Sequence, residues 1–109
     1  MAYRSEGGCW LEYLFDWDPK KAALNQRKHR VSFERAATVF RDPRAASIPD
    51  EEHSVEEDRW VTLGLDAGAS LLVLVHTFEE VDAARFRIRL ISARKATKKE
   101  SAQYGKANR

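Results

Sequence analysis

The fold of this chain is decided by Arg85-Phe86-Arg87-Ile88-Arg89-Leu90-Ile91-Ser92-Ala93-Arg94-Lys95. In the first half of this segment, three arginines alternate with three apolar residues. Because side chains of a strand point alternately to its two faces, the pattern predicts a strand with one buried apolar face and one face of guanidinium groups. Arg94 and Lys95 follow where the strand ends. An outer strand whose charges only keep a sheet edge soluble would show the same alternation.

The charge of the chain is distributed unevenly. The 109 residues carry a formal net charge of +2, but the part from Arg85 onward has nine Lys or Arg and one acid, a formal +8. The residues before Arg85 therefore sum to −6. This asymmetry indicates an anionic partner for the C-terminal part, and nucleic acid is the commonest such partner.

Length and composition exclude several classes of protein. The length suits one domain with a modest core. The longest wholly apolar run, Leu71 to Val75, is far too short to span a membrane, and no signal peptide is recognisable. The single cysteine, Cys9, excludes an intrachain disulfide framework and fits a reducing cytoplasm. His29, His53 and His76 are too scattered to suggest a metal site, and we predict neither a metal nor a cofactor.

The first half of the chain predicts one strand and two helices. Tyr13 to Trp17 has the pattern of a short strand. Asp18-Pro19 is a strong helix start, with Asp as N-cap and Pro at the first helical position, and the helix should end at His29. Ser32 is a second N-cap, and the apolar spacing from Phe33 to Phe40 is that of an amphipathic helix. Residues 1–14 have no clear period, and we expect a flexible N-terminal extension before one domain over residues 15–109.

The second half predicts strands and a closing helix. We expect strands at Ala45–Ile48, at Arg59–Leu65 and, in the centre of the sheet, at Leu71–Val75. Glu79 to Ala83 should turn the chain into the arginine strand. Thr97-Lys98-Lys99-Glu100 has the form of a capping box for the last helix. The order β-α-α-β-β-β-α predicts an α+β fold, with an antiparallel sheet, two N-terminal helices on one face and the other face open.

Several of these segments together resemble the BrnT toxins. They are Phe15-Asp16-Trp17-Asp18-Pro19-Lys20-Lys21-Ala22, Asn25, Lys28 to Ala36, Asp50 with His53-Ser54, Glu57-Asp58-Arg59, and Arg89 to Thr97 with Glu100 and Tyr104. The likeness runs from Phe15 to Tyr104. The sequence departs from the family at Arg30, where BrnT toxins usually have a glycine that ends the helix. Residues 1–14 look like an extension that the family generally lacks.

The resemblance implies a fold and a function. It implies a RelE-like fold and a cytoplasmic type II toxin, similar to small ribonucleases that inhibit translation by cutting RNA without a metal. It also implies a BrnA-like antitoxin with a ribbon-helix-helix part. Operator DNA would then be bound only through the toxin–antitoxin complex, and no membrane partner is implied.

Metal-independent RNA cleavage defines which residue types the site needs. The 2′-OH attacks the phosphate, so cations must stabilise the charge that develops there, while a base and an acid transfer protons. Arginine stays charged and matches phosphate oxygens bidentately. We therefore expect Arg59, Arg89 and Arg94 at the phosphate, Lys95 nearby, and Arg85 and Arg87 on the flanking RNA backbone. For Arg59, an ion pair with the adjacent acidic run is an equally good explanation.

The candidates for proton transfer are His53, Glu57 and His76. Histidine titrates near neutral pH, so both histidines suit either role. His53 could equally be an exposed loop residue. For His76 the sheet register decides: opposite Arg87 it would share the cationic face, and opposite Phe86 it would point into the core.

Two further questions stay open at this level. The same cationic face could bind nucleic acid or an acidic antitoxin without cutting, in a module that acts as corepressor of its own operon. Such a module would need the arginines but no histidine or glutamate beside them. Trp17 and Trp60 are candidates for stacking on bases, although core packing explains Trp17 better.

Overall fold

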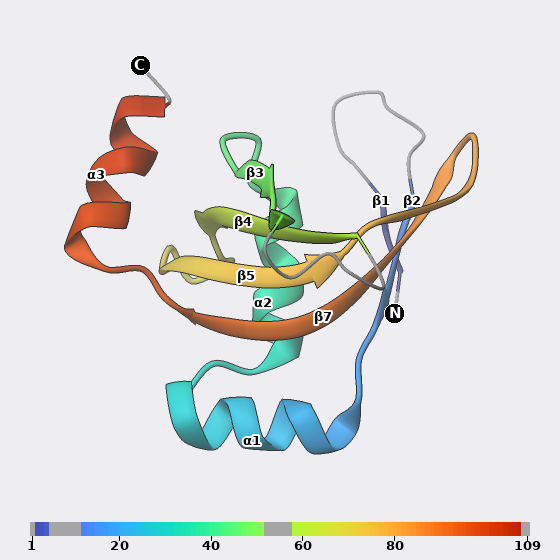
Figure 1. The fold of residues 1–109 in the computed structure, drawn as a ribbon, viewed down its shortest axis with the longest axis horizontal. Helices are drawn as coiled ribbons and strands as arrows, with labels where there is room; N and C mark the ends of the chain where they lie inside the picture. Colours follow the sequence, from blue (N-terminus) through green and yellow to red (C-terminus); the bar gives the residue numbers. More distant parts are fainter. Residues whose placement is uncertain (1, 5–11, 52–57, 108–109) are drawn as a thin grey trace.

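The computed structural model describes residues 2–4, 12–51 and 58–107. These residues form one seven-stranded mixed sheet with three α-helices and a short 3₁₀ helix, η1 (Figure 1). The strands are β1 (Ala2–Arg4), β2 (Glu12–Asp16), β3 (Ala46–Pro49), β4 (Arg59–Leu65), β5 (Leu71–Thr77), β6 (Glu79–Asp82) and β7 (Arg85–Lys95). The helices are α1 (Pro19–His29), α2 (Phe33–Ala37), η1 (Thr38–Arg41) and α3 (Lys98–Ala107). The predicted α+β class is therefore confirmed.

The sheet runs in the order β1-β2-β7-β5-β4-β3, and β6 also pairs with β7. The prediction of a purely antiparallel sheet was wrong at one pairing, because β2 runs parallel to β7. After β2 the chain passes through α1 and α2 to β3 at the far edge of the sheet, and the antiparallel pairings of β3 with β4, β4 with β5 and β5 with β7 then bring β7 alongside β2 in the same direction. The arginine strand β7 is consequently central and has neighbours on both sides.

Two segments that we expected to lie outside the sheet form strands in it. Glu79–Asp82 was expected to be only a turn, but it forms β6, which pairs with β7 across a register shift. Ala2–Arg4 pairs with β2 as β1, and Glu12 to Leu14 belong to β2 itself. Where the domain begins stays a prediction, but these parts of the N-terminal segment are hydrogen-bonded strands.

Helix α1 begins and ends at its expected residues. The side chain of Asp18 accepts a hydrogen bond of 2.9 Å from the backbone N–H of Lys20, and Pro19 is the first helical residue. Arg30 ends the helix in the left-handed conformation, with φ 57° and ψ 31°. The resemblance led us to expect a glycine at this position, because a side chain in this conformation costs about 1 kcal/mol.

A buried asparagine connects α1 to the arginine strand. The side-chain nitrogen of Asn25 donates to the carbonyls of Val31 at 3.0 Å and Ala93 at 2.8 Å. Its side-chain oxygen accepts from the backbone N–H of Ala93 at 3.0 Å. The amide of Asn25 thus pairs with β7 as a neighbouring strand would, and it fixes the helix against the sheet.

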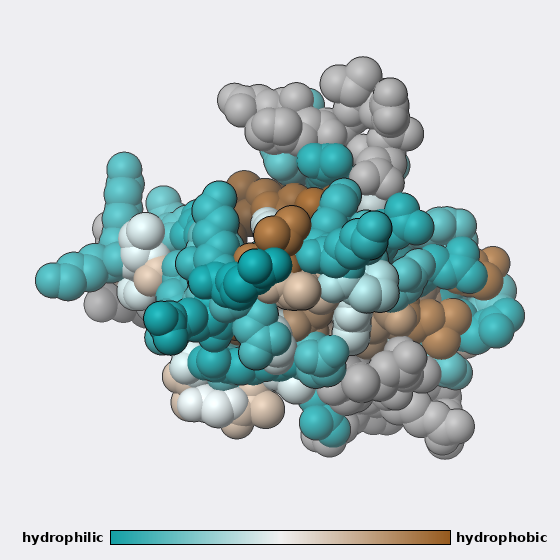
Figure 2. All heavy atoms as spheres, turned by 90° about the horizontal axis from the view of Figure 1, so that it is seen from below, coloured by the Kyte–Doolittle hydropathy of each residue, from teal (hydrophilic) through white to brown (hydrophobic). Residues whose placement is uncertain are grey.

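The core lies between the two N-terminal helices and the sheet. It contains Phe15, Val31, Phe33, Ala36, Ala37, Val39, Leu72, Leu74, Ile88, Leu90 and Ala93, all buried. Leu72 and Leu74 are fully buried in β5, which confirms the prediction of a central strand. Seen from the side of α1, the surface is mostly hydrophilic and apolar side chains show only in small areas (Figure 2). The outer face of α1 is thus left to solvent.

The C-terminal helix α3 lies apart from α1 (Figure 1). The predicted capping box is present: the backbone N–H of Thr97 donates to Glu100 at 2.8 Å, and that of Glu100 donates to the Thr97 hydroxyl at 3.2 Å. The hydroxyl of Tyr104 donates to the carboxylate of Asp42 at 2.8 Å. A few polar side chains therefore hold this helix to the rest of the domain.

Candidate functional site

The predicted alternation of β7 is confirmed. Arg85, Arg87 and Arg89 are exposed, while Ile88 and Leu90 between and after them are buried in the core. The guanidinium groups therefore lie on the face of the sheet that α1 and α2 do not cover.

A bulge in β7 extends this arrangement to Arg94. Val75 of β5 pairs with Ser92, but the next residue, His76, pairs with Leu90, so Ile91 is an extra residue in β7. Leu90 and Ala93 are consequently both buried although they are three positions apart. Without the bulge, Arg94 would point to the face opposite Arg89, five residues earlier. With it, both arginines share the open face.

Each of these four arginines lies near a carboxylate of the same chain. The pairs are Arg85–Asp82 at 2.7 Å, Arg87–Glu79 at 3.9 Å, Arg89–Asp16 at 3.9 Å and Arg94–Glu100 at 2.8 Å. The pairs of Arg87 and Arg89 are long, and both partners are well exposed. Exposed ion pairs contribute only about 0–1 kcal/mol, so an anion can replace either carboxylate at little cost.

Arg87 and Arg89 line a groove of about 410 Å³ on this face. Its other lining residues are Asp16, Asp58, Thr77, Phe78 and Glu79. Two guanidinium groups therefore face three carboxylates, which makes the groove cationic only along β7. The hydroxyl of Thr77 also accepts from the backbone N–H of Arg89 at 3.1 Å, which fixes the end of β5 against β7.

Arg94 is held differently from the other arginines. Its two terminal nitrogens donate to the two oxygens of Glu100 at 2.8 and 2.9 Å. This hydrogen-bonded pair raises the pKa of Arg94 and lowers the pKa of Glu100 to about 2. Arg94 does not line the groove of Arg87 and Arg89, since five residues of strand span about 16 Å.

The structure separates His76 from the arginines. It pairs with Leu90, lies on the helix face of the sheet and is only 1% exposed. Its Nε2 is 2.6 Å from the hydroxyl of Thr62, and its Nδ1 is 2.8 Å from the carbonyl of Thr77. Burial lowers the pKa of His76 to about 4, so the ring is neutral at neutral pH.

The remaining candidates lie at the margins of the site. Arg59 is the first residue of β4, is half-buried and pairs with Thr77, so the register places it on the open face. Lys95 pairs with Leu72, which places it on the face opposite Arg94. His53 and Glu57 lie outside the described residues.

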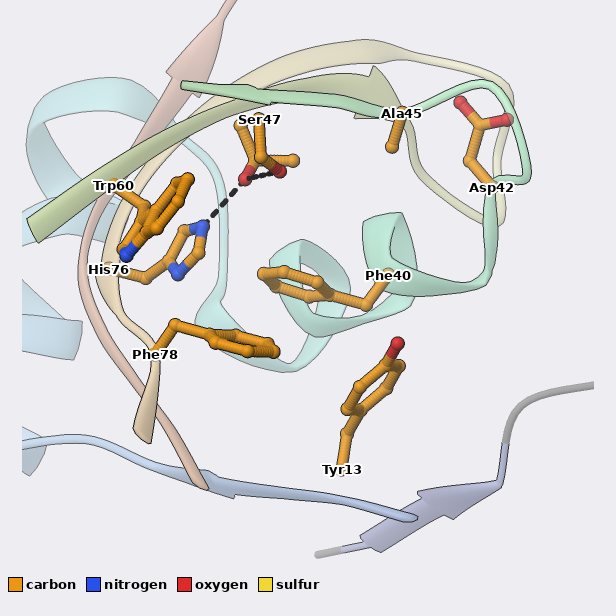
Figure 3. Close-up of a pocket in the computed structure, with 9 residues that line it drawn as sticks. Tyr13, Phe40, Asp42, Ala45, Ser47, Trp60, His76 and Phe78 are labelled. Atoms are coloured by element: carbon orange, nitrogen blue, oxygen red, sulfur yellow. Dashed lines mark hydrogen bonds between the residues drawn. The ribbon is translucent and has the colours of Figure 1, made fainter. Parts of the chain in front are cut away.

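A second pocket, which the sequence did not predict, lies on the helix side of the sheet. Its walls are the aromatic rings of Tyr13, Phe40, Trp60 and Phe78, and its volume is about 310 Å³ (Figure 3). These four rings come from separate elements, so no spacing in the sequence connects them. Trp60 thus lines a pocket, whereas Trp17 packs edge-on against Phe33 in the core.

The fold and the site define a small α+β domain with a row of exposed arginines along a central strand of its sheet. A family model described as the ribonuclease toxin BrnT of type II toxin–antitoxin systems matches residues 17–100. The chain therefore belongs to the BrnT family of ribonuclease toxins, which confirms the resemblance seen in the sequence. No curated protein matches it. Among the described residues, no helix has the length and apolar character needed to cross a membrane.

Proposed function

We propose that this chain is the toxin of a type II toxin–antitoxin pair and an endoribonuclease that inhibits translation. Family membership supports the ribonuclease activity and the existence of an antitoxin. The finer points are proposals from the resemblance: a RelE-like fold, a cytoplasmic location and a BrnA-like antitoxin with a ribbon-helix-helix part. Operator DNA would be bound only through the complex.

The groove along β7 is the observation that carries the RNA-binding part of this proposal. Arg87 and Arg89 point into it, and their carboxylate partners are 3.9 Å away and exposed. An RNA phosphate would take the place of Glu79 and Asp16, because arginine binds phosphate through two parallel hydrogen bonds. Arg85 would contact the RNA backbone next to this point.

We propose metal-independent cleavage through attack of the 2′-OH on the bound phosphate. Arg89, with Arg59 on the same face, would stabilise the charge that develops, whereas Arg94, about 16 Å along the strand, would contact the RNA farther along. His53 and Glu57 remain the proposed proton-transfer residues, and Asp58 and Asp16 offer further carboxylates at the groove. His76 would reach RNA only from the helix side of the sheet.

A cleavage assay tests this function. The purified protein is incubated with a labelled single-stranded RNA in EDTA, and the product ends are analysed. We expect cleavage that leaves 2′,3′-cyclic phosphate ends, and we expect Arg89→Gln to reduce the rate about a hundredfold or more. Arg27→Gln is the matched control, because Arg27 is an exposed arginine of α1 outside the groove. An unchanged rate in Arg89→Gln would contradict the proposed role of the groove.

One observation favours a second function. All four arginines of the open face already pair with carboxylates, and the groove carries three acids against two arginines. A non-catalytic module that binds nucleic acid or its antitoxin and acts as corepressor would tolerate this balance. RNA binding without any cleavage in the assay above would favour that module.

A further inference from the structure

The aromatic pocket on the helix side is walled mainly by rings, and its few polar groups lie at separate points of the wall. Tyr13, Phe40, Trp60 and Phe78 surround the hollow, while Ser47 lies near Trp60 and His76, and Asp42 lies on the other side, beyond Ala45 (Figure 3). The ring of His76 meets Phe40 edge-on, with centroids 4.9 Å apart. A flat ligand that is apolar on its faces and polar along its edges would therefore fit this pocket.

Hydrogen bonds fix the direction in which the protons of the wall point. The carbonyl of Thr77 can only accept, so Nδ1 of His76 carries the proton in that 2.8 Å contact. In the neutral ring Nε2 is then an acceptor, and the Thr62 hydroxyl donates to it. The Thr62 oxygen must in turn accept from the hydroxyl of Ser47, 2.7 Å away. Ser47 thus presents only lone pairs to the pocket.

Asp42 presents acceptors as well. Its carboxylate accepts from the backbone N–H groups of Leu65 and Arg44, both at 2.9 Å, and from the hydroxyl of Tyr104 at 2.8 Å. Burial alone would raise the pKa of Asp42, but these hydrogen bonds outweigh it and the pKa is lowered. A ligand edge that meets either Ser47 or Asp42 must therefore donate hydrogen bonds.

The pocket and the groove of Arg87 and Arg89 lie on opposite faces of the sheet and share one lining residue. Phe78 lines both cavities, is 38% exposed and stacks on Phe86 with ring centroids 4.9 Å apart. A nucleotide whose phosphate lies at Arg87 and Arg89 would place its base in the pocket by passing it around Phe78, the residue that separates the two cavities. The two cavities together match the two parts of a nucleotide.

We propose that the aromatic pocket binds a nucleobase of the RNA held in the groove, and that it prefers amino-bearing bases to uracil. This inference rests on the proposed function and names a base subsite for it. Adenine, cytosine and guanine offer an amino group to an acceptor at Ser47 or at Asp42. Uracil has one N–H between two carbonyl oxygens, which would face those acceptors. The aromatic walls supply stacking, which any base can use.

Aromatic walls with a carboxylate would also suit a cationic side chain of a partner protein. The wall that the pocket shares with the arginine groove at Phe78 argues for the nucleotide, since Arg87 and Arg89 beyond it attract anions and repel cations. The cationic occupant is therefore an outcome of the test and not the proposal.

The test uses 2′-O-methyl RNA pentamers, which lack the attacking hydroxyl and cannot be cleaved. Three versions carry adenine, uracil or no base at the central position, and their dissociation constants are measured by calorimetry. We expect adenine to bind at least about fivefold more tightly than the abasic pentamer. We expect it to bind about fivefold more tightly than uracil. Phe78→Leu should reduce the difference in affinity between the adenine pentamer and the abasic pentamer.

Two substitutions test the direction of the hydrogen bonds. Ser47→Ala removes the acceptor and should abolish the preference for adenine over uracil. Thr62→Val frees the proton of Ser47, which can then donate to a uracil carbonyl, so the preference should shift toward uracil. Ser101→Ala in α3 is the matched control and should leave the preference unchanged. A preference for adenine that persists in both pocket variants would overturn the proposal.

The outcomes separate this inference from the proposed function. If Arg87→Gln weakens all three pentamers but the central base has no effect, the groove binds RNA and the base subsite is refuted. If no pentamer binds, the proposed function fails, and free adenosine then decides the inference through the indole NMR signal of Trp60. A shift lost in Ser47→Ala supports the subsite. A shift with tetramethylammonium but not with adenosine overturns it in favour of a cationic partner.

Discussion

Arg94 of β7 and Glu100 of α3 form two parallel hydrogen bonds of 2.8 and 2.9 Å. Glu100 is also the N3 residue of the capping box that starts α3, where it accepts from the backbone N–H of Thr97. One carboxylate therefore both starts the last helix and holds an arginine of the open face.

Replacing Glu100 should loosen α3. Glu100→Gln removes the charge from both interactions, and because the pair is partly exposed we expect a loss of only about 1 kcal/mol in the free energy of unfolding. Amide hydrogen exchange should show the loss mainly in α3. Lys99→Gln, an exposed change one residue earlier, is the control. Exchange that rises equally across β5 and β7 would contradict a local role.

The same carboxylate predicts a dependence on acid. The folded pKa of Glu100 is about 2, below its ordinary value near 4.5, so its contribution is complete above about pH 4.5. It should be lost as the pH falls from there toward 2. In denaturant unfolding curves, Glu100→Gln should have a flatter acid limb than the natural protein over that window. Parallel limbs in the two proteins would show that the pair contributes nothing.

The burial of His76 predicts a second pH range, above that of Glu100, in which the stability of the fold changes. Burial lowers its folded pKa to about 4, so the unfolded chain binds its proton first as the pH falls below about 6.5. Stability from this group is therefore complete above pH 6.5, and about 3 kcal/mol is lost as the pH falls toward 4. His76→Gln cannot titrate and should lack this decline. Equal slopes between pH 6.5 and 4.5 would contradict a neutral, buried His76.

Replacing Arg30 by glycine should stabilise the fold. Its left-handed backbone costs a side chain about 1 kcal/mol, which glycine avoids, although glycine also makes the unfolded chain more flexible. Arg30→Gly should therefore raise the free energy of unfolding by about 0.5 kcal/mol. Arg27→Gly, inside α1, should lower it by about 1 kcal/mol. Thermal unfolding of the two variants should give shifts of opposite sign.

Replacing Asn25 should greatly reduce the free energy of unfolding. Asn25→Ala leaves the carbonyls of Val31 and Ala93 and the N–H of Ala93 without their partner in the core. We expect a loss of about 3 kcal/mol, because buried polar groups without partners are costly. Gln26→Ala changes the exposed neighbour and should stay within about 0.5 kcal/mol of the natural protein. A small loss in Asn25→Ala would mean that water or a shifted backbone replaces the amide.

The arginine strand was predictable because its signal is local. Alternating arginine and apolar residues set the bounds of β7, and the cap of Asp18 set the start of α1. Both patterns depend only on neighbours in the sequence, so tertiary context did not change them.

The rest of the site depends on pairings between distant segments. The extra residue at Ile91, which brings Arg94 to the face of Arg89, appears only when β7 is aligned with β5. That same register places His76 on the helix side of the sheet, and the register could not be predicted from the sequence. The carboxylates near Arg87 and Arg89 come from β6 and β2, and neither pairing with β7 was predicted.

The central claim is that an RNA phosphate replaces the carboxylates that pair with Arg87 and Arg89. The most direct measurement is the dissociation constant of a single-stranded 2′-O-methyl RNA as a function of salt. Removing the competing acids with Asp16→Asn and Glu79→Gln should tighten binding, whereas Arg87→Gln and Arg89→Gln should each weaken it and flatten the salt dependence by about one charge. If the acid variants weaken binding as much as the arginine variants do, RNA does not replace those carboxylates and the groove is not its site.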